Sequence, residues 1–318
     1  HHKELKLSND DLKKEMNVKQ ALSHIKKTGI DKETIDTCYV MDNNRRLEGY
    51  LPLRRLILSD SDELVENIMD TNIIFTNTLE DQEEVATRFK KYDLTSMPVV
   101  DRENRLVGII TIDDIIDIIE EENTEDFQKM AAMEPFEEEY LKTSVISLAK
   151  HRVTWLLVLM ISATFTGNII KHFEEAIQSV VLLAAFIPML MDTGGNAGSQ
   201  SSTLIIRGLA LGEIEIKDII KIISKELLVG TIVGGILALV NFLRLVYLER
   251  TGVPLALTVC ISLCVTVLLA KVVGGILPII AKKLKVDPAI MASPLITTIV
   301  DAVSLLVYFY IASALLNI

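Results

Sequence analysis

Several features that would indicate an enzyme or a nucleic-acid-binding protein are missing from the sequence. Only three cysteines occur in 318 residues, Cys38 in a charged stretch and Cys260 and Cys264 in an apolar one, so no disulfide framework is indicated. The sequence contains no P-loop and no constellation typical of a catalytic nucleophile. Its formal net charge of −11 argues against nucleic acid as a partner, because phosphates bind to basic surfaces.

Half of the residues are hydrophobic, but they are concentrated in the second part of the chain. Before about Lys150 apolar residues alternate with charged ones, whereas long runs with little or no charge follow it. This distribution predicts a soluble domain ahead of a membrane domain. The opening His1 and His2 are typical of an affinity tag, so we set residues 1–8 aside as a tag remnant and leader.

The negative charge is concentrated in one segment. Residues 113–139 contain twelve acidic residues and a single base, Lys129, which gives this segment a net charge of −11. Such a segment favours cations as ligands. A solvated face of an acidic helix is the alternative interpretation.

The soluble part contains an internal repeat. Residues 39–56 match residues 98–115 when the chain is shifted by 59 positions, which pairs Asp42 with Asp101 and Gly49 with Gly108. Each copy is predicted to form an apolar strand, a polar turn, a second strand that contains the glycine, and a helix.

The pattern of a strand, D-x-x-x-R-L-x-G, a second strand and D-D-I resembles the CBS domain, with copies at residues 9–68 and 69–126. Two tandem copies form the usual module of that family. The resemblance implies an α+β cytosolic module that regulates an attached domain by sensing ions or nucleotides, with ATP as a possible ligand of the pair.

Five apolar runs follow, each near the ~20 residues that cross a bilayer. They are residues 153–170, 176–191, 227–243, 253–270 and 288–318. The sequence therefore predicts an all-α membrane domain at residues 151–318 with five transmembrane helices.

The bases that flank these runs are unequally distributed, with ten on the side of the repeats against two, Lys171 and Arg250, on the other. By the positive-inside rule, the amino terminus is cytosolic and the carboxyl terminus lies outside the cell (inner) membrane. The ten bases are Lys142, Lys150, Arg152, Arg207, Lys217, Lys221, Lys225, Lys282, Lys283 and Lys285.

Two of the expected crossings carry polar residues at spacings of three or four, which places them on one helix face. The first stripe is Pro188, Asp192, Asn196, Ser199, Thr203 and Arg207, and the second is Pro294, Thr297, Thr298, Asp301, Ser304 and Tyr308. Lipid does not solvate such faces, so both are expected to turn inward.

Asp301 lies near the middle of the last run, where a carboxylate is costly unless it meets water, a cation or a partner. We interpret Asp301 as functional. An ion pair with Lys271, or a protonated carboxyl between helices, is the structural alternative. Asp192 could add a second acidic ring or pair with a nearby base, and the sequence leaves both possibilities open.

Two blocks carry a second family resemblance. The sequence from Pro188 to Arg207, PMLMDTGGNAGSQSSTLIIR, resembles the signature of the MgtE magnesium channels, and DPAIMASPLITTIVD from Asp287 to Asp301 resembles that family's last helix. With the tandem repeats and the five runs, the likeness covers essentially the whole chain. The family usually carries a further helical domain ahead of the CBS pair, and this sequence begins almost directly at the repeats.

The MgtE resemblance implies a homodimeric magnesium channel, embedded in membrane lipid, with one pore aspartate from each subunit holding a largely hydrated Mg2+. Carried over position by position, the pore site comprises Asp301, Asn196, Gly194, Gly195 and Thr298. This agrees with the chemistry of Mg2+, which loses water reluctantly and is held by one or two carboxylates.

The resemblance also implies cytosolic Mg2+ sensing that closes the channel, transmitted by a linker or plug helix at residues 127–150. Bound Mg2+ would bridge acids that otherwise repel one another. The matching acids are Asp114, Asp117, Glu122, Glu125, Asp126 and Asp287, with Glu83 and Asp93 as weaker matches.

Two other functions remain open at this point. A secondary transporter of Mg2+ or other divalent cations could use Asp192 and Asp301 as exchange sites, and would depend on a second ion gradient. A membrane-anchored nucleotide sensor would explain the CBS pair but not the two polar stripes.

Overall fold

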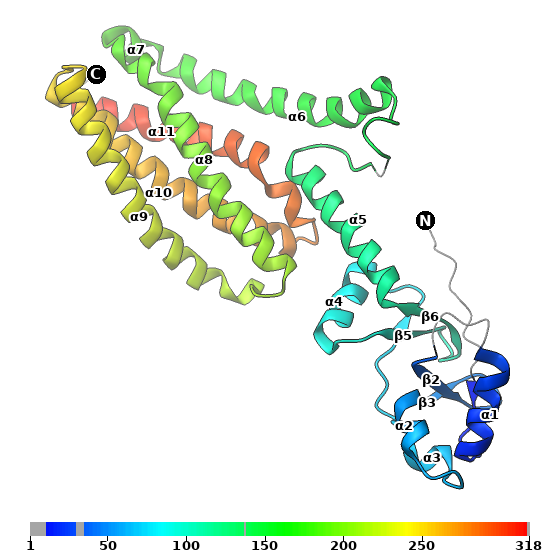
Figure 1. Cartoon of the computed structure of the whole chain (residues 1–318). Coiled ribbons are helices and arrows are strands. Elements are labelled where there is room, and N and C mark those ends of the chain that lie inside the picture. The colour runs from blue at the N-terminus through cyan, green and yellow to red at the C-terminus, as the bar shows by residue number, and fades with distance from the viewer. Residues whose placement is uncertain (1–10, 30–34, 137, 317–318) are drawn as a thin grey trace. The chain divides into compact units, whose positions relative to one another are not determined.

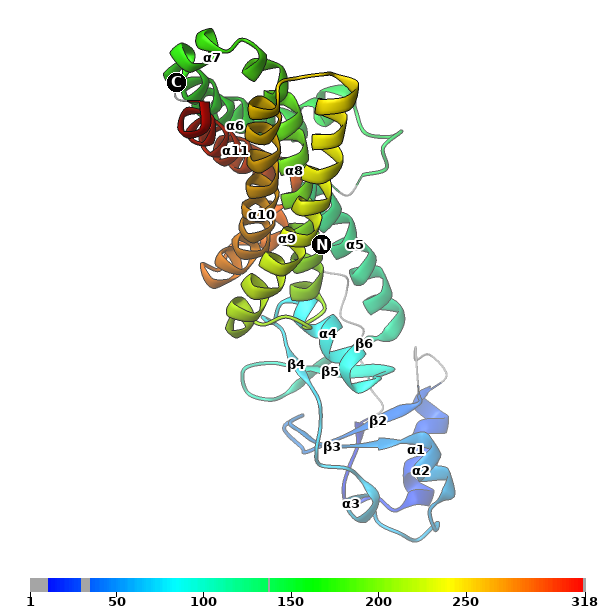
Figure 2. The same ribbon diagram turned by 90° about the vertical axis from the view of Figure 1, so that its left-hand side faces the viewer.

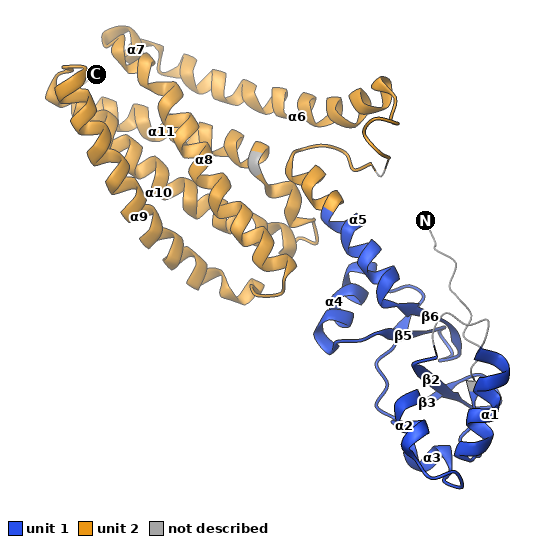
Figure 3. Ribbon diagram, viewed as in Figure 1, with its two compact units in different colours: residues 1–123 blue, residues 124–318 orange. Residues whose placement is uncertain are grey.

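The computed structural model describes residues 11–29, 35–136 and 138–316, and the chain divides into two compact units, residues 1–123 and 124–318 (Figure 3). The expected leader, residues 1–8, lies outside the described residues. The division falls inside one helix, α5(Ile112–Met130), slightly before the predicted end of the second repeat at residue 126.

Unit 1 is an α+β unit that contains two three-stranded sheets, in the orders β1-β2-β3 and β4-β5-β6 (Figure 1). In each sheet the first pair of strands is parallel and the second antiparallel. The first copy contains β1(Asp11–Leu12), α1(Val18–Thr28), β2(Thr37–Met41), β3(Leu47–Pro52), α2(Leu53–Leu58) and α3(Val65–Ile68). The second contains β4(Thr76–Asn77), α4(Gln82–Tyr92), β5(Ser96–Val100), β6(Leu106–Thr111) and the start of α5.

The strand registers confirm the internal repeat. Val40 pairs with Gly49 in the first sheet and Val99 with Gly108 in the second, which are equivalent positions. The turns match as well. The carboxylates of Asp42 and Asp101 each accept hydrogen bonds from the backbone N–H groups two and four positions downstream. An aspartate followed by a residue at positive φ thus closes both turns.

The two copies meet through these turns. The backbone N–H of Leu47 donates to the carbonyl of Asn104 at 3.1 Å, and the N–H of Leu106 donates to the carbonyl of Arg45 at 2.9 Å. Because the four residues are pairwise equivalent in the repeat, the two copies are related by an approximate twofold axis. Their side chains form a shared core of Tyr39, Met41, Leu106 and Ile109.

The predicted linker helix at residues 127–150 is wrong as a continuous helix. α5 ends at Met130, and α6(Val145–His172) begins fifteen positions later. Ala132 adopts a left-handed φ of 53°, and Pro135 follows it, so the helix cannot continue. The side chain of Gln128 then fixes the turn by bonding both the N–H and the carbonyl of Phe136.

Unit 2 is helical. After α6 it contains α7(Glu174–Ser179), α8(Leu182–Ala210), η2(Ile216–Asp218), α9(Ile219–Leu243), η3(Arg244–Leu248), α10(Val253–Lys283), η4(Pro288–Met291) and α11(Ser293–Leu316). Helix α10 packs against α8, α9 and α11, and α8 also packs against α11 (Figures 1 and 2). Helix α6 makes its main contacts with α11, and only 6% of its most apolar stretch is buried.

Four of the described helical segments are long and apolar enough to cross a membrane. They are Val145–His172, Ile216–Leu248, Val253–Lys283 and Pro294–Leu316. Helix α8 has 29 residues, or about 43 Å, but its many glycine, serine and amide residues keep it out of this set. The second apolar run, predicted at residues 176–191, is divided at Val180 between α7 and α8.

Candidate functional site

The predicted pore residues come from α8 and α11, which pack against each other. A Cβ built on Gly194 would lie 2.8 Å from the Ser304 hydroxyl, and one built on Gly195 would lie 2.8 Å from the methyl carbon of Thr297. A larger residue at either position would have to displace facing side chains, those of α11 at both positions and that of Thr266 on α10 at Gly194. The structure therefore gives both glycines a packing role, and their lining of a pore stays a prediction.

The polar stripe of α8 lies on the surface of the single chain. Asp192, Asn196, Thr203 and Arg207 are exposed, although α8 lies in sequence between the apolar helices α6 and α9. Asp301 on α11 is half-buried, and it is close enough to Asp192 for the two carboxylates to interact electrostatically. Helices α8 and α11 thus bring two acids together next to an open polar face.

The hydroxyl groups of α11 bond within their own helix. Thr298 donates to the carbonyl of Pro294 at 3.0 Å, and Ser304 donates to the carbonyl of Val300 at 2.7 Å. Such bonds use the hydroxyl proton and leave oxygen lone pairs free to accept, which is the polarity that a hydrated cation requires.

The alternative ion pair between Asp301 and Lys271 is not found among the residues that the structure describes. Lys271 is 5% exposed, and its ammonium donates to the side-chain oxygen of Gln200 at 3.5 Å. It therefore holds α10 to α8 rather than neutralising Asp301. Asp192 likewise forms no ion pair with a base within the described ranges, and pairing with one is not supported.

Glu226 on α9 was not among the site residues predicted from the sequence. Its carboxylate accepts a hydrogen bond of 2.6 Å from the hydroxyl of Ser201 on α8. Gly275 of α10 lies against the same side chain, since a Cβ there would be 3.1 Å from the Cγ of Glu226. An acid directly ahead of the apolar residues 227–243 was the signal that could have identified it.

Two of the predicted sensing acids of unit 1 form hydrogen bonds with uncharged partners. Asp114 accepts from the hydroxyl of Thr111 at 3.0 Å, and Glu122 accepts from the amide of Gln82 at 2.6 Å. Glu83 follows the N-cap of α4, and Asp93 ends that helix at a left-handed φ of 51°. In the described part of one chain, no three acids, histidines or cysteines form a group that could hold a metal ion.

Two of the predicted acids, Glu125 and Asp287, are brought together by Lys129. Its ammonium lies 2.5 Å from Glu125 Oε1 and 2.5 Å from Asp287 Oδ2. Burial lowers the pKa of Lys129, but the hydrogen bonds to Asp287 and Glu125 outweigh burial and raise that pKa above its ordinary value. Lys129 is thus protonated at neutral pH, where it links the end of α5 to the start of η4.

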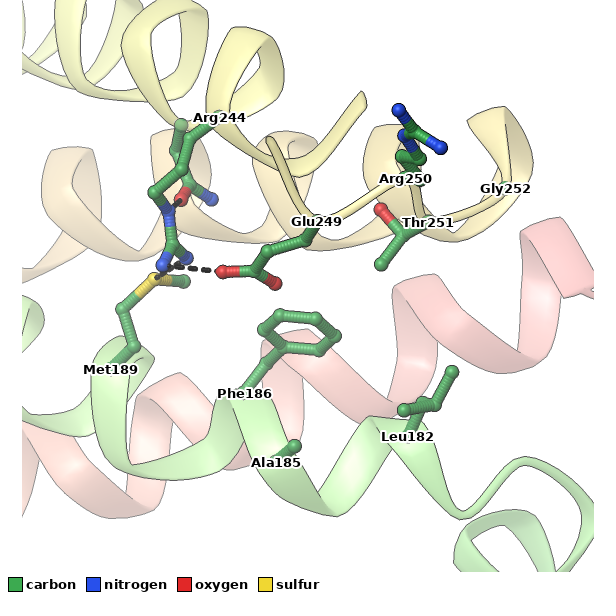
Figure 4. A pocket seen from close by; sticks show the side chains of 10 residues that line it. Leu182, Ala185, Phe186, Met189, Arg244, Glu249, Arg250, Thr251 and Gly252 are labelled. Atoms are coloured by element: carbon green, nitrogen blue, oxygen red, sulfur yellow. Dashed lines mark hydrogen bonds and ion pairs between the residues drawn. The ribbon is translucent and has the colours of Figure 1, made fainter. Parts of the chain in front are cut away.

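A cleft of about 710 Å³ lies between α8 and the connection from α9 to α10, at the end of α10 opposite Asp287. Figure 4 shows Arg244 extending across it toward Glu249 and Met189, and the ion pair with Glu249 measures 2.8 Å. Two arginines, Arg244 and Arg250, line the cleft, so it does not suit a cation. Arg244 lines this cleft together with Arg250, so the predicted count of bases on the side opposite the repeats rises from two to three.

Comparison with known proteins agrees with the two resemblances. The sequence profile of the MgtE family, described as a divalent cation transporter, matches residues 187–311, and that of the CBS domain matches residues 65–121. The magnesium transporter MgtE of Thermus thermophilus is 40% identical over 95% of this chain and 67% of its own length. That of Bacillus subtilis is 38% identical over 94% of this chain and 66% of its own length.

A solved structure described as the cytosolic domain of the Mg2+ channel MgtE in complex with ATP is 42% identical, with a TM-score of 0.34, over 34% of this chain and 44% of that one.

The chain spans about two thirds of the length of the relatives from Thermus thermophilus and Bacillus subtilis, which are named as transporters and not as enzymes. By its identity to these relatives across nearly all of its own length, the chain belongs to the MgtE family of divalent cation transporters.

Proposed function

We propose that the chain is one subunit of a homodimeric Mg2+ channel, with α6, α8, α9, α10 and α11 as five membrane crossings and closure controlled by cytosolic Mg2+. The observation that carries this proposal is the open polar stripe of α8 next to Asp301. The relatives named as magnesium transporters support Mg2+ as the substrate.

A second copy of the chain is the natural cover for the stripe. Asp192 and Asn196 are exposed on a 29-residue helix that lies in sequence between the apolar spans Val145–His172 and Ile216–Leu248. Lipid would leave their polar atoms without partners. A twofold axis along α8 would place both stripes around one water-filled path. The carboxylates of Asp301 from the two subunits would then face the same ion.

The chemistry of this path suits a hydrated divalent cation. Mg2+ keeps most of its water and needs oxygen acceptors more than a closed cage of ligands. Asp301 supplies charge, Asn196 supplies an amide oxygen, and Thr298 supplies a hydroxyl lone pair. A site of this kind binds the ion weakly enough for it to leave again, which conduction requires.

Regulation is proposed to act through the acids of α5 and through Asp287. Apart from the pair that Lys129 bridges, Glu125 and Asp287, these acids repel one another at low Mg2+. At high Mg2+ the bound cations draw the acidic segments together and close the path. The acids are Asp114, Asp117, Glu122, Glu125, Asp126 and Asp287, with Glu83 and Asp93 as weaker members. The amino terminus is proposed to be cytosolic and the carboxyl terminus outside.

ATP binding by the CBS pair stays a prediction. A cleft of about 160 Å³ between the two copies is lined by Tyr39, Tyr50, Asp93 and Thr95, among others. Its polar rim is compatible with a ribose or base, and binding of ATP to the purified chain would test it. Asp93 would then belong to a nucleotide site in place of a metal site.

The alternative is an ion-coupled transporter, and the proximity of Asp192 and Asp301 is the observation that favours it. Two interacting acids can exchange a proton or Na+ for a divalent ion. Mg2+ flux into proteoliposomes separates the two functions. A channel conducts with a Mg2+ gradient alone, whereas a coupled transporter needs a pH or Na+ gradient, and a strict need for either would contradict our proposal.

A further inference from the structure

The ammonium of Lys129 occupies the position where a metal ion bridging Glu125 and Asp287 would lie. Its distances to the two carboxylates are both 2.5 Å, and all three residues belong to the same compact unit. Glu125 stands one helical turn before Lys129 on α5, whereas Asp287 follows it by 158 positions and caps η4. The side chain of Lys129 is 22% exposed.

The lysine and a bridging Mg2+ exclude each other. Mg2+ binds carboxylate oxygens at about 2.1 Å, and an ammonium hydrogen-bonded to the same two oxygens leaves no room for the ion between them. The Lys129 ammonium and a Mg2+ ion bound to the same two carboxylates would also repel each other strongly, because the site is partly buried. A divalent cation can therefore bridge Glu125 and Asp287 only when Lys129 moves away.

We propose that Lys129 is a built-in competitor of Mg2+ at Glu125 and Asp287 and thereby determines the Mg2+ concentration at which the channel responds. This inference rests on the proposed sensing function. At low Mg2+ the lysine neutralises the two acids and links α5 to the segment that leads into α11. At high Mg2+ the divalent ion displaces the ammonium and takes over the bridge.

The contacts of Asp287 support an exchange rather than a permanent salt bridge. Its Oδ1 accepts from the backbone N–H of Ala289 at 2.8 Å, while Oδ2 faces Lys129. The carboxylate is thus oriented by η4 whichever cation lies at Oδ2. Lysine is suited to such exchange because its flexible stem carries a compact charge that can withdraw into water.

The test uses the full chain in lipid nanodiscs, with limited proteolysis of the α5–α6 connection followed as Mg2+ is raised. Lys129→Met keeps the apolar stem and removes the charge, so the Mg2+ concentration for half-maximal protection falls about tenfold. Lys129→Arg keeps the charge and stays near the wild-type value. An unchanged or higher midpoint for Lys129→Met would overturn the inference.

Two controls separate the charge at this place from a general loss of positive charge. Lys142 is exposed and pairs with Glu139 three positions away, and Lys142→Met leaves the midpoint unchanged. In an Asp287→Asn background the contested carboxylate is gone, so adding Lys129→Met produces only a small further shift. A full tenfold shift in that background would contradict competition at Asp287.

The outcomes also separate this inference from the proposed function. A wild-type chain whose cleavage does not respond to Mg2+ would overturn both sensing and competition. A wild-type chain that responds, together with a Lys129→Met variant that responds at the same concentration, would overturn the competition alone.

Discussion

Gly198 of α8 and Gly274 of α10 meet backbone to backbone, and a Cβ built on Gly274 would lie 2.2 Å from the carbonyl oxygen of Gly198. Small residues at such crossings let membrane helices approach closely. The contact fixes α8 against the most buried helix of unit 2. The orientation of the α8 polar stripe therefore depends on it.

We predict that Gly274→Ala destabilises unit 2 by about 1–3 kcal/mol, because the methyl group must push backbone away. Gly235 on α9 is the matched control, since a Cβ there meets nothing within 4 Å. Gly235→Ala should be neutral or slightly stabilising, as alanine favours helix over glycine. Thermal unfolding in detergent measures both, and equal melting temperatures for the two variants would refute the close contact.

The half-buried acceptor Glu226 on α9 gives a second prediction. The Ser201 hydroxyl, on a side chain that is 1% exposed, donates at 2.6 Å to Glu226 and at 3.4 Å to the carbonyl of Ala197. Glu226→Ala removes the shorter bond, which is made to a charged acceptor, and should cost about 1–3 kcal/mol. Glu226→Gln retains an acceptor oxygen and should be milder. If the two substitutions lower the melting temperature equally, the charge and not the hydrogen bond is responsible.

The turn of the second repeat should respond to pH. Backbone N–H groups, foremost that of Arg105, and the Arg105 guanidinium hold the pKa of Asp101 below its usual range. The carboxylate therefore stabilises the folded turn above the unfolded pKa of about 3.9, and this stabilisation is lost as pH falls through the lower folded pKa. Asp42 in the first repeat should behave in the same way, with Arg46 as the leading donor.

Hydrogen exchange of the Glu103 and Arg105 amides, corrected for intrinsic rates, measures this effect. Protection should persist at pH 5 and decline below about pH 4 in the wild-type chain. Asp101→Ala should lack this protection at every pH. Protection that is independent of both pH and the substitution would exclude the carboxylate as the cause.

The proposed dimer predicts that α8 of one copy faces α8 of its partner. In a chain freed of Cys38, Cys260 and Cys264, Asn196→Cys should form crosslinked dimers on mild oxidation. Leu228→Cys on α9, at a position that is 68% exposed, should remain monomeric. Crosslinking at position 228 without crosslinking at 196 would place the interface on another helix.

The repeat and the helical unit could be predicted from sequence because both depend on local patterns. The 59-residue repeat predicted two strands joined by a polar turn in each copy, and the equivalent registers of Val40 and Val99 confirm the repeat. The third strand of each sheet, β1 or β4, was not predicted. The length and composition of four spans were equally local properties. The MgtE family followed from the blocks around Asp192 and Asp287.

What could not be predicted depends on contacts between distant segments. The end of α5 at Met130 depends on the left-handed Ala132 and on the hydrogen bonds between Gln128 and Phe136. Pro135 alone could have indicated from the sequence that the helix is interrupted. The link between Lys129 and Asp287 joins residues 158 positions apart, and no pattern announces it. The residues of the proposed pore remain predictions, because one chain supplies only one side of it.

The most direct test is Mg2+ flux into proteoliposomes for the wild-type chain and for Asp301→Ala, with and without Mg2+ on the side of the CBS repeats. Our account predicts that wild-type flux needs only a Mg2+ gradient and that Mg2+ on the CBS side suppresses it. Asp301→Ala should reduce the flux at least tenfold, which corresponds to a rise of about 1.4 kcal/mol or more in the activation free energy of conduction. Normal flux through a well-folded Asp301→Ala variant would contradict the assignment of this carboxylate to the pore.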